Sequence, residues 1–144
     1  MNINIKKLNN KAVIPTQAHP GDAGNDLYAC LDEPVIINAG ETVKIPTGLS
    51  IAIPDGYFGA IFARSGLATK QGLRPANCVG VCDAQYRGEY IVALHNDNNN
   101  DVEIKHGDKV AQLIVMPFLS VTFNEVDDLD DTERGADGFG STGV

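Results

Sequence analysis

Short runs of β-branched and aromatic residues, separated by tight turn signals, recur along almost the whole 144-residue chain. Glycine, proline, asparagine and aspartate gather between the runs, in segments such as NAGE, IPDG, YRGE and KHGD. Many short strands with frequent turns are typical of a β-sandwich or β-barrel and do not fit alternating strand and helix units. We therefore expect strands at residues 3–5, 35–37, 42–45, 49–53, 57–62, 90–95, 110–115 and 121–123.

Only one stretch of the chain favours a helix. Residues 65–71 (SGLATKQ) are followed by Gly72, the residue type that most often ends a helix. The polar segment NDNNND at 96–101 is explained by a tight turn rich in asparagine and aspartate. The predicted fold is all-β, a jelly-roll-like β-barrel or sandwich with one short helix.

The C-terminal end departs from the strand pattern. The acidic segment DDLDDTE at 127–133 is typical of a solvated linker, and the glycine-rich segment RGADGFGSTGV at 134–144 follows it. We expect a folded domain at 1–126 and a flexible arm at 127–144. An arm that ends in ligand-binding residue types often reaches a neighbouring subunit.

Composition narrows the functional classes. The formal net charge is −8 and the pI is near 4.6, and an acidic surface repels polyphosphate backbones, so we expect no nucleic-acid partner. No apolar run approaches the roughly 20 residues of a membrane span, and the first residues lack a secretory pattern. We expect a soluble cytoplasmic protein (intracellular, if the source is viral), with Cys30, Cys78 and Cys82 as buried thiols.

The first segment of unusual chemistry is Arg64-Ser65-Gly66, at the junction of a predicted strand and the helix. A helix start offers free N–H groups, and Arg64 adds a guanidinium, so the segment suits a phosphate. Ser65 could equally be an ordinary helix N-cap, and the sequence leaves both interpretations open.

The second segment is GVCDAQYRGEY at 80–90, predicted as strand, turn and strand. The Asp83 carboxylate could orient or deprotonate a water molecule, and Tyr86 could pack against a sugar or a base. The local pattern alone favours an ordinary turn with a cross-strand tyrosine.

Two further segments complete the set. Gln112 interrupts the apolar strand of GDKVAQLIV, either as an outward residue or as a placed hydrogen-bonding group. In the tail, Arg134 is a phosphate-type donor, Gly138 and Gly140 leave backbone amides open, and Phe139 could stack on a base. Together the four segments fit a nucleoside polyphosphate and attack by water.

In order along the chain, AGNDLYA, ARSGLATKQG, GVCDAQYRGEY, GDKVAQLIV and RGADGFGSTG resemble the five motifs of the homotrimeric dUTPase family. The resemblance covers about Lys7 to Val144. It implies a jelly-roll-like β-barrel and a homotrimer with three sites at subunit interfaces. It also implies hydrolysis of dUTP to dUMP and pyrophosphate, with Mg2+ bound to the triphosphate. Such a reaction keeps uracil out of DNA and supplies dUMP.

The resemblance assigns roles at the nucleoside end of the substrate. Asp83 matches the catalytic aspartate that activates the attacking water at the α-phosphorus. Tyr86 matches the tyrosine that packs against deoxyribose and excludes a 2′-hydroxyl. The uracil-reading pocket is matched by Asn77 and by the main chain of the hairpin, from Gly80, Val81 and Cys82 to Asp83 and onward to Ile91.

At the phosphate end, the resemblance assigns contacts to Arg64, Ser65, Gly66 and Gln112. Asp26 matches the aspartate that meets the metal through water, since Mg2+ tends to keep its hydration shell. In the tail, Arg134 would clamp the γ-phosphate, Phe139 would cover the uracil, and Gly140 and Ser141 would also contact substrate. The tail would thus be a lid donated to a neighbour's site and ordered by ligand.

The chain departs from the family pattern at three positions. Asn25 stands where an aromatic residue is usual, Ala63 where proline is usual, and Gln85 where an acidic residue is common.

Two other functions compete with dUTP hydrolysis. A dCTP deaminase would need a catalytic glutamate where Ala93 stands, whereas a dUTP-responsive binding or regulatory protein on the same fold stays open.

Overall fold

The computed structural model describes residues 1–138 and shows an all-β fold with one helix. The elements in chain order are β1 (Asn4–Lys7), β2 (Asn25–Tyr28), β3 (Val35–Ile37), β4 (Thr42–Pro46), β5 (Leu49–Ala52), β6 (Tyr57–Phe62), α1 (Ser65–Gln71), β7 (Leu73–Pro75), β8 (Gly80–Cys82), β9 (Ile91–Asn96), β10 (Val102–Ile104) and β11 (Lys109–Pro117). The predicted all-β class is confirmed.

Most strands lie where the runs of β-branched and aromatic residues predict them. β3, β6 and α1 have the predicted bounds, and β1, β4, β5, β9 and β11 differ from the predicted ranges by a few residues at their ends. The short strands β2, β7 and β10 were not predicted from those runs. The strand expected at 121–123 is wrong: this segment pairs with nothing in the described chain, and Phe123 is 91% exposed.

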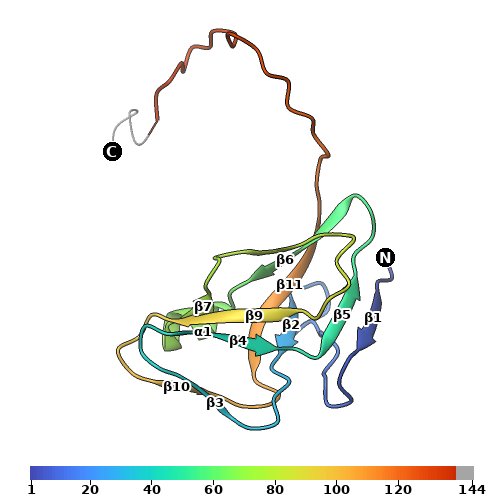
Figure 1. The fold of residues 1–144 in the computed structure, drawn as a ribbon, viewed down its shortest axis with the longest axis vertical. Helices are drawn as coiled ribbons and strands as arrows, with labels where there is room; N and C mark the ends of the chain where they lie inside the picture. The colour runs from blue at the N-terminus through green and yellow to red at the C-terminus, as the bar shows by residue number, and fades with distance from the viewer. Residues whose placement is uncertain (139–144) are drawn as a thin grey trace.

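The strands form four antiparallel sheets that do not join into one closed barrel. The largest has the order β2-β11-β6-β8, and the next has the order β4-β9-β7. The pairs β1-β5 and β3-β10 make up the others. Figure 1 shows β4 and β9 crossing the front of the molecule with β11 behind them.

One apolar cluster fills the space between these sheets. It draws residues from all four sheets, including Ile45, Leu94, Leu113, Ile51 and Ile37, each at most 4% exposed. Burying such side chains provides the main driving force for folding, about 1.5–3 kcal/mol for each large one. The sequence pattern therefore builds a core between stacked sheets.

A buried asparagine explains the polar segment at 96–101. Asn96 is fully buried at the end of β9, and its Nδ2 donates to the carbonyls of Ile37 and Asn100, both at 2.9 Å. Its Oδ1 accepts from the Asn98 N–H at 2.9 Å. The predicted tight turn is confirmed, and one amide side chain ties it to β3.

The cysteines differ in environment. Cys30 is buried in the core, Cys82 is half-buried, and Cys78 is exposed in the connection between β7 and β8. The expectation of three buried thiols is therefore wrong for Cys78 and only partly right for Cys82. Cys78 has a φ of 62°, because the chain turns sharply there between two short strands.

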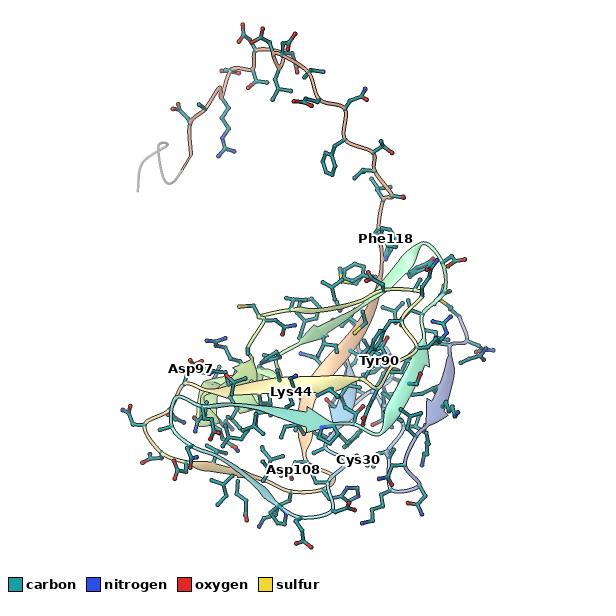
Figure 2. All side chains as sticks on the ribbon, viewed as in Figure 1. Cys30, Lys44, Tyr90, Asp97, Asp108 and Phe118 are labelled. Carbon is teal, nitrogen blue, oxygen red and sulfur yellow. The ribbon has the colours of Figure 1, made fainter. Side chains whose placement is uncertain are left out.

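Beyond β11, the chain leaves the body as an extended arm. From Phe118 to residue 138 it contains no helix or strand, and Figure 1 shows it running away from the sheets. Phe118 anchors its root, since its N–H donates to the Gly56 carbonyl at 3.1 Å and its ring packs edge-on against Phe58. Figure 2 shows the side chains of the arm standing clear of the sheets, apart from Phe118 at its root. Among residues 1–138, no helix is long and apolar enough to cross a membrane.

Candidate functional site

The first part of the site begins where β6 ends and α1 starts. Arg64 is the N-cap residue, with an extended backbone (φ −86°, ψ 128°), and no side chain caps the helix by a hydrogen bond. Ser65 is therefore the first helical residue, and the reading of Ser65 as an N-cap is wrong. The Ser65 hydroxyl is not used in helix capping, which leaves it for another partner.

Asp26 lies between two cationic side chains. The carboxylate is buried, with Arg64 Nε 2.7 Å from Oδ1 and Lys109 Nζ 2.8 Å from Oδ2. The Lys109 ammonium also lies 5.9 Å from the centre of the Tyr28 ring. Oδ2 accepts no well-directed hydrogen bond from the residues described. The two cations offset the charge of Asp26, and the Arg64 guanidinium has further N–H donors that suit an anion.

Gln112 is a placed hydrogen-bonding group rather than merely an outward residue. On β11 it pairs with Asp26 of β2 and with Phe62 of β6. Its Nε2 donates to the Ala63 carbonyl at 2.8 Å, and its Oε1 occupies the space that a side chain on Gly24 would need. The amide is thereby fixed beside Arg64 and Asp26.

Asp26, Arg64 and Gln112 line one pocket of about 530 Å3, which we call the cationic pocket after its Arg64 guanidinium, although two carboxylates also line it and Lys109 does not. It contains five residues predicted from the sequence: Asp26, Arg64, Ser65, Gly66 and Gln112. It also contains Asp22, which sequence reasoning missed because it sits within a glycine-containing turn cluster. Asp22 Oδ2 accepts from the His19 N–H at 2.9 Å. The sequence could have indicated Asp22, because it is a second carboxylate four residues before Asp26.

A second pocket of about 270 Å3, which we call the hairpin pocket, lies at β8 and the turn after it. It contains the remaining predicted residues of the body: Asn77, Gly80, Val81, Cys82, Asp83, Tyr86 and Ile91. β8 is held against β6 by the pairs Ile61–Gly80 and Gly59–Cys82. Glu89 and Tyr90 also line this pocket; the sequence predicts their main chain there, as part of the hairpin, but no role for their side chains.

Asp83 is exposed at the start of the turn that follows β8. Its backbone carbonyl accepts from the Tyr86 N–H at 3.0 Å. Arg87 closes the turn, because its Nη1 donates to the carbonyls of Ala84 and Tyr86 at 2.6 and 2.9 Å. The carboxylate therefore stands on a braced turn at the edge of the pocket, where it can accept a hydrogen bond from water.

The inner wall of the hairpin pocket is electrically neutral. Burial raises the pKa of the Cys82 thiol, and burial also raises the pKa of the Tyr90 phenol, with Cys82 adding to it. Both groups thus stay protonated at neutral pH. The Tyr90 hydroxyl is buried and has no hydrogen-bond partner among the described residues, since the nearby thiol does not meet it with suitable geometry. Such a wall suits an uncharged base and sugar.

The two pockets have no lining residue in common, so one chain divides the predicted residues between them. Arg134 lies in the exposed arm, where its Nε donates to the Asp137 carbonyl at 2.9 Å, and it belongs to neither pocket. The predicted residues Phe139, Gly140 and Ser141 lie outside the described residues.

Comparisons with known proteins point to one family. Residues 10–143 match the family model described as dUTPase. Over 132 residues, the chain is 51% identical to the deoxyuridine 5′-triphosphate nucleotidohydrolase of Desulfitobacterium hafniense, covering 91% of this chain and 87% of the relative.

Solved structures agree with this match. The Staphylococcus bacteriophage 80alpha dUTPase with dUPNHPP superposes with a TM-score of 0.90 at 28% identity, covering 99% of both chains. A mutant dUTPase from phage phi11 of S. aureus, described with a structural Mg(II) ion, shares the fold with a TM-score of 0.82 at 24% identity. That match covers 91% of this chain and 100% of the phage chain.

The ion pairs of Asp26 generate a prediction about stability. Asp26→Asn should lower the free energy of unfolding by about 2 kcal/mol, because it leaves two cations without their shared partner. The loss is smaller than for a fully buried pair because Arg64 and Lys109 keep access to water.

Chemical denaturation at fixed protein concentration measures this change. Asp32→Asn is the matched control, since it breaks the exposed pair of Asp32 with Lys11 and should leave the transition unchanged. Equal effects of the two substitutions would contradict a stabilising role for the Asp26 cluster.

Proposed function

This chain belongs to the dUTPase family and hydrolyses dUTP, and we propose that Asp83 activates the water that attacks the α-phosphorus. The products are dUMP and pyrophosphate, so the reaction removes dUTP from the pool used for DNA synthesis and supplies dUMP. One observation carries the proposal. The chain pairs a pocket that holds the Arg64 guanidinium with a hairpin pocket that has a neutral inner wall and an exposed carboxylate at its edge.

The nucleoside end of dUTP is assigned to the hairpin pocket. Backbone donors and acceptors of β8, with the Asn77 amide, can pair with the uracil edge, and the neutral wall at Cys82 and Tyr90 imposes no charge on it. A pocket built on such pairing rejects bases with other donor patterns, because its polar groups would be left unpaired. Tyr86 supplies an aromatic face for the deoxyribose.

The phosphate end is assigned to the cationic pocket. The Arg64 guanidinium, the Ser65 hydroxyl, the Gly66 amide and the Gln112 amide supply donors for phosphate oxygens. When water attacks, its oxygen bonds to the α-phosphorus, its proton passes to the Asp83 carboxylate, and the bond from the α-phosphorus to the bridging oxygen breaks. Pyrophosphate then leaves, with its negative charge facing Arg64.

The cofactor is Mg2+, and the residues of the cationic pocket fit an ion that is held through its water ligands. No group of three metal-ligating side chains occurs among residues 1–138, so the pocket has no all-protein cage for a cation. Asp26 Oδ2 lacks a well-directed hydrogen bond, and Asp22 lies in the same pocket. Asp26, joined by Asp22, would hold the water ligands of the ion, which neutralises charge on the triphosphate when bound.

We assign the active form to a homotrimer with its sites between subunits. The outward face of the sheet β2-β11-β6-β8 supports this assembly, because its residues alternate with those that face the core. Five side chains on that face are apolar and half-buried or exposed: Phe58, Phe62, Val81, Ile114 and Met116. Gln112 lies on the same face, so a neighbour seated there would stand beside the cationic pocket.

The C-terminal arm is assigned as a lid. We assign residues 1–126 to the nucleotide-hydrolase domain and residues 127–144 to an acidic linker followed by the lid, with the extended arm already beginning at Phe118 after β11. The support is that Arg134 lies far along an arm that leaves its own body, so a neighbouring copy offers it a site. There Arg134 would clamp the γ-phosphate, Phe139 would cover the uracil, and Gly140 and Ser141 would add contacts. Closure would exclude bulk water during the reaction.

The function is tested by pyrophosphate release from dUTP, dTTP, dCTP and UTP, each with Mg2+ and with EDTA. The unchanged protein should act on dUTP alone and only with the metal. Asp83→Asn should keep nucleotide affinity and lower kcat by about 10²–10⁴-fold, the usual contribution of a general base.

Asp32→Asn is the matched control for this variant, because Asp32 is an exposed carboxylate that lines neither pocket and does not lie beside Asp83. It should retain full turnover. If Asp83→Asn also turned over normally, the assignment of Asp83 as the base would be wrong.

Removal of the lid gives a second prediction. A chain ending at Glu133 should keep the assembled state of the full-length protein, because the sheets and their outward face are intact, but it should lose most of its activity. Size-exclusion chromatography with light scattering, run beside the kinetic assay, separates these effects. Loss of assembly in the shortened chain would show that the tail is structural rather than a lid.

A further inference from the structure

The turn that carries Asp83 also holds the Tyr86 side chain in a defined pose. Tyr86 is 44% exposed at the edge of the hairpin pocket, and its hydroxyl donates to the Glu89 carbonyl at 2.9 Å. The side chain thus folds back over its own turn instead of extending into water. The Glu89 segment is itself anchored, since Glu89 Oε1 accepts from the Gly48 N–H at 2.7 Å.

Gly88 provides the space for this pose. A Cβ atom on Gly88 would collide with the Tyr86 hydroxyl oxygen, and it would lie 2.6 Å from Cζ and 2.9 Å from Cε2 of the same ring. The φ of Gly88 lies outside the left-handed region, so the backbone there does not demand glycine. Glycine at this position is explained by the ring of Tyr86 that covers it.

Tyr90 supports the same ring from within the protein. The centres of the Tyr86 and Tyr90 rings are 6.0 Å apart at an interplanar angle of 50°, within the range of favourable aromatic pairs. Tyr90 is 1% exposed, its N–H donates to the Leu49 carbonyl at 2.8 Å, and its carbonyl accepts from Thr47 Oγ1 at 2.6 Å. Its buried ring therefore forms a fixed platform.

We propose that Gly88 and Tyr90 are positioning residues that fix the Tyr86 ring as a preformed wall of the nucleoside pocket, and that this rigidity sets the preference for deoxyribose over ribose. The inference rests on the proposed function, in which Tyr86 packs against the sugar. A wall that is already in place cannot move aside for an added hydroxyl, whereas a mobile ring could rotate into water and admit it. Selectivity for the sugar would then precede closure of the arm.

Gly88→Ala tests this inference, because the added methyl group displaces the Tyr86 ring without demanding a new backbone conformation. We expect KM for dUTP to rise, kcat to change little, and the ratio of kcat/KM for dUTP over UTP to fall by roughly tenfold or more. Calorimetric binding of the non-hydrolysable analogue dUpNHpp and its ribose counterpart should show the same loss of preference without turnover.

A double-mutant cycle that combines Gly88→Ala with Tyr86→Ala separates an effect through the Tyr86 ring from a general disturbance of the fold. Tyr86→Ala alone should lose the sugar preference, and Gly88→Ala added to it should cause no further change, since no ring remains to be displaced. Tyr90→Leu tests the platform. It removes the ring that supports Tyr86, so the sugar preference should fall, and full preference in this variant would overturn the role of Tyr90.

The outcomes distinguish this inference from the proposed function. Failure of the unchanged protein to release pyrophosphate from dUTP would count against the proposed function, while the binding comparison would still test the positioning of Tyr86. A Tyr86→Ala variant that keeps the sugar preference would overturn the role of the ring. A loss in Tyr86→Ala together with full preference in Gly88→Ala, or additive effects in the double variant, would overturn the positioning role.

Discussion

Backbone pairing of β6 with a strand on each side is the interaction on which both pockets depend. One edge of β6 pairs with β11, which places Gln112 opposite Phe62, and the other edge pairs with β8, which sets the floor of the hairpin pocket. The same strand leads through Ala63 into Arg64 and α1. One strand thus fixes the proposed phosphate donors at its end and the proposed nucleoside-binding backbone along its edge, and a slip of one residue would reverse the faces of both.

Two glycines, which have no side chain, shape the site as much as the polar groups do. Gly24 leaves room for the Gln112 amide, and Gly88 leaves room for the Tyr86 ring. The pockets also differ in their polar groups, because the Arg64 guanidinium lies in one and the protonated Cys82 and Tyr90 line the inner wall of the other. The proposed placement of the triphosphate and the nucleoside follows this difference.

The sequence predicts the local features of this protein better than its tertiary ones. Gly72 marks the end of α1 and the β-branched runs mark most strands, because those signals are local. The strand predicted at 121–123 is wrong, because an alternating segment forms a strand only where another strand pairs with it. The places of Asp22 and Tyr90 in the pockets depend on sheet register and turn geometry, which the order of residues does not reveal. The five motifs locate the predicted site residues of the body, but not their division between two separate pockets.

That division leads to the central claim, that each working site joins the hairpin pocket of one copy to the cationic pocket of another. Mixing two inactive variants tests it most directly: Asp83→Asn, which damages the hairpin pocket, and Arg64→Ala, which damages the cationic pocket. After the two are unfolded and reassembled together, random mixing should restore activity at about a quarter of the sites. Activity that stays at the level of the separate variants, in assemblies shown to contain both chains, would mean that each site is built within a single chain.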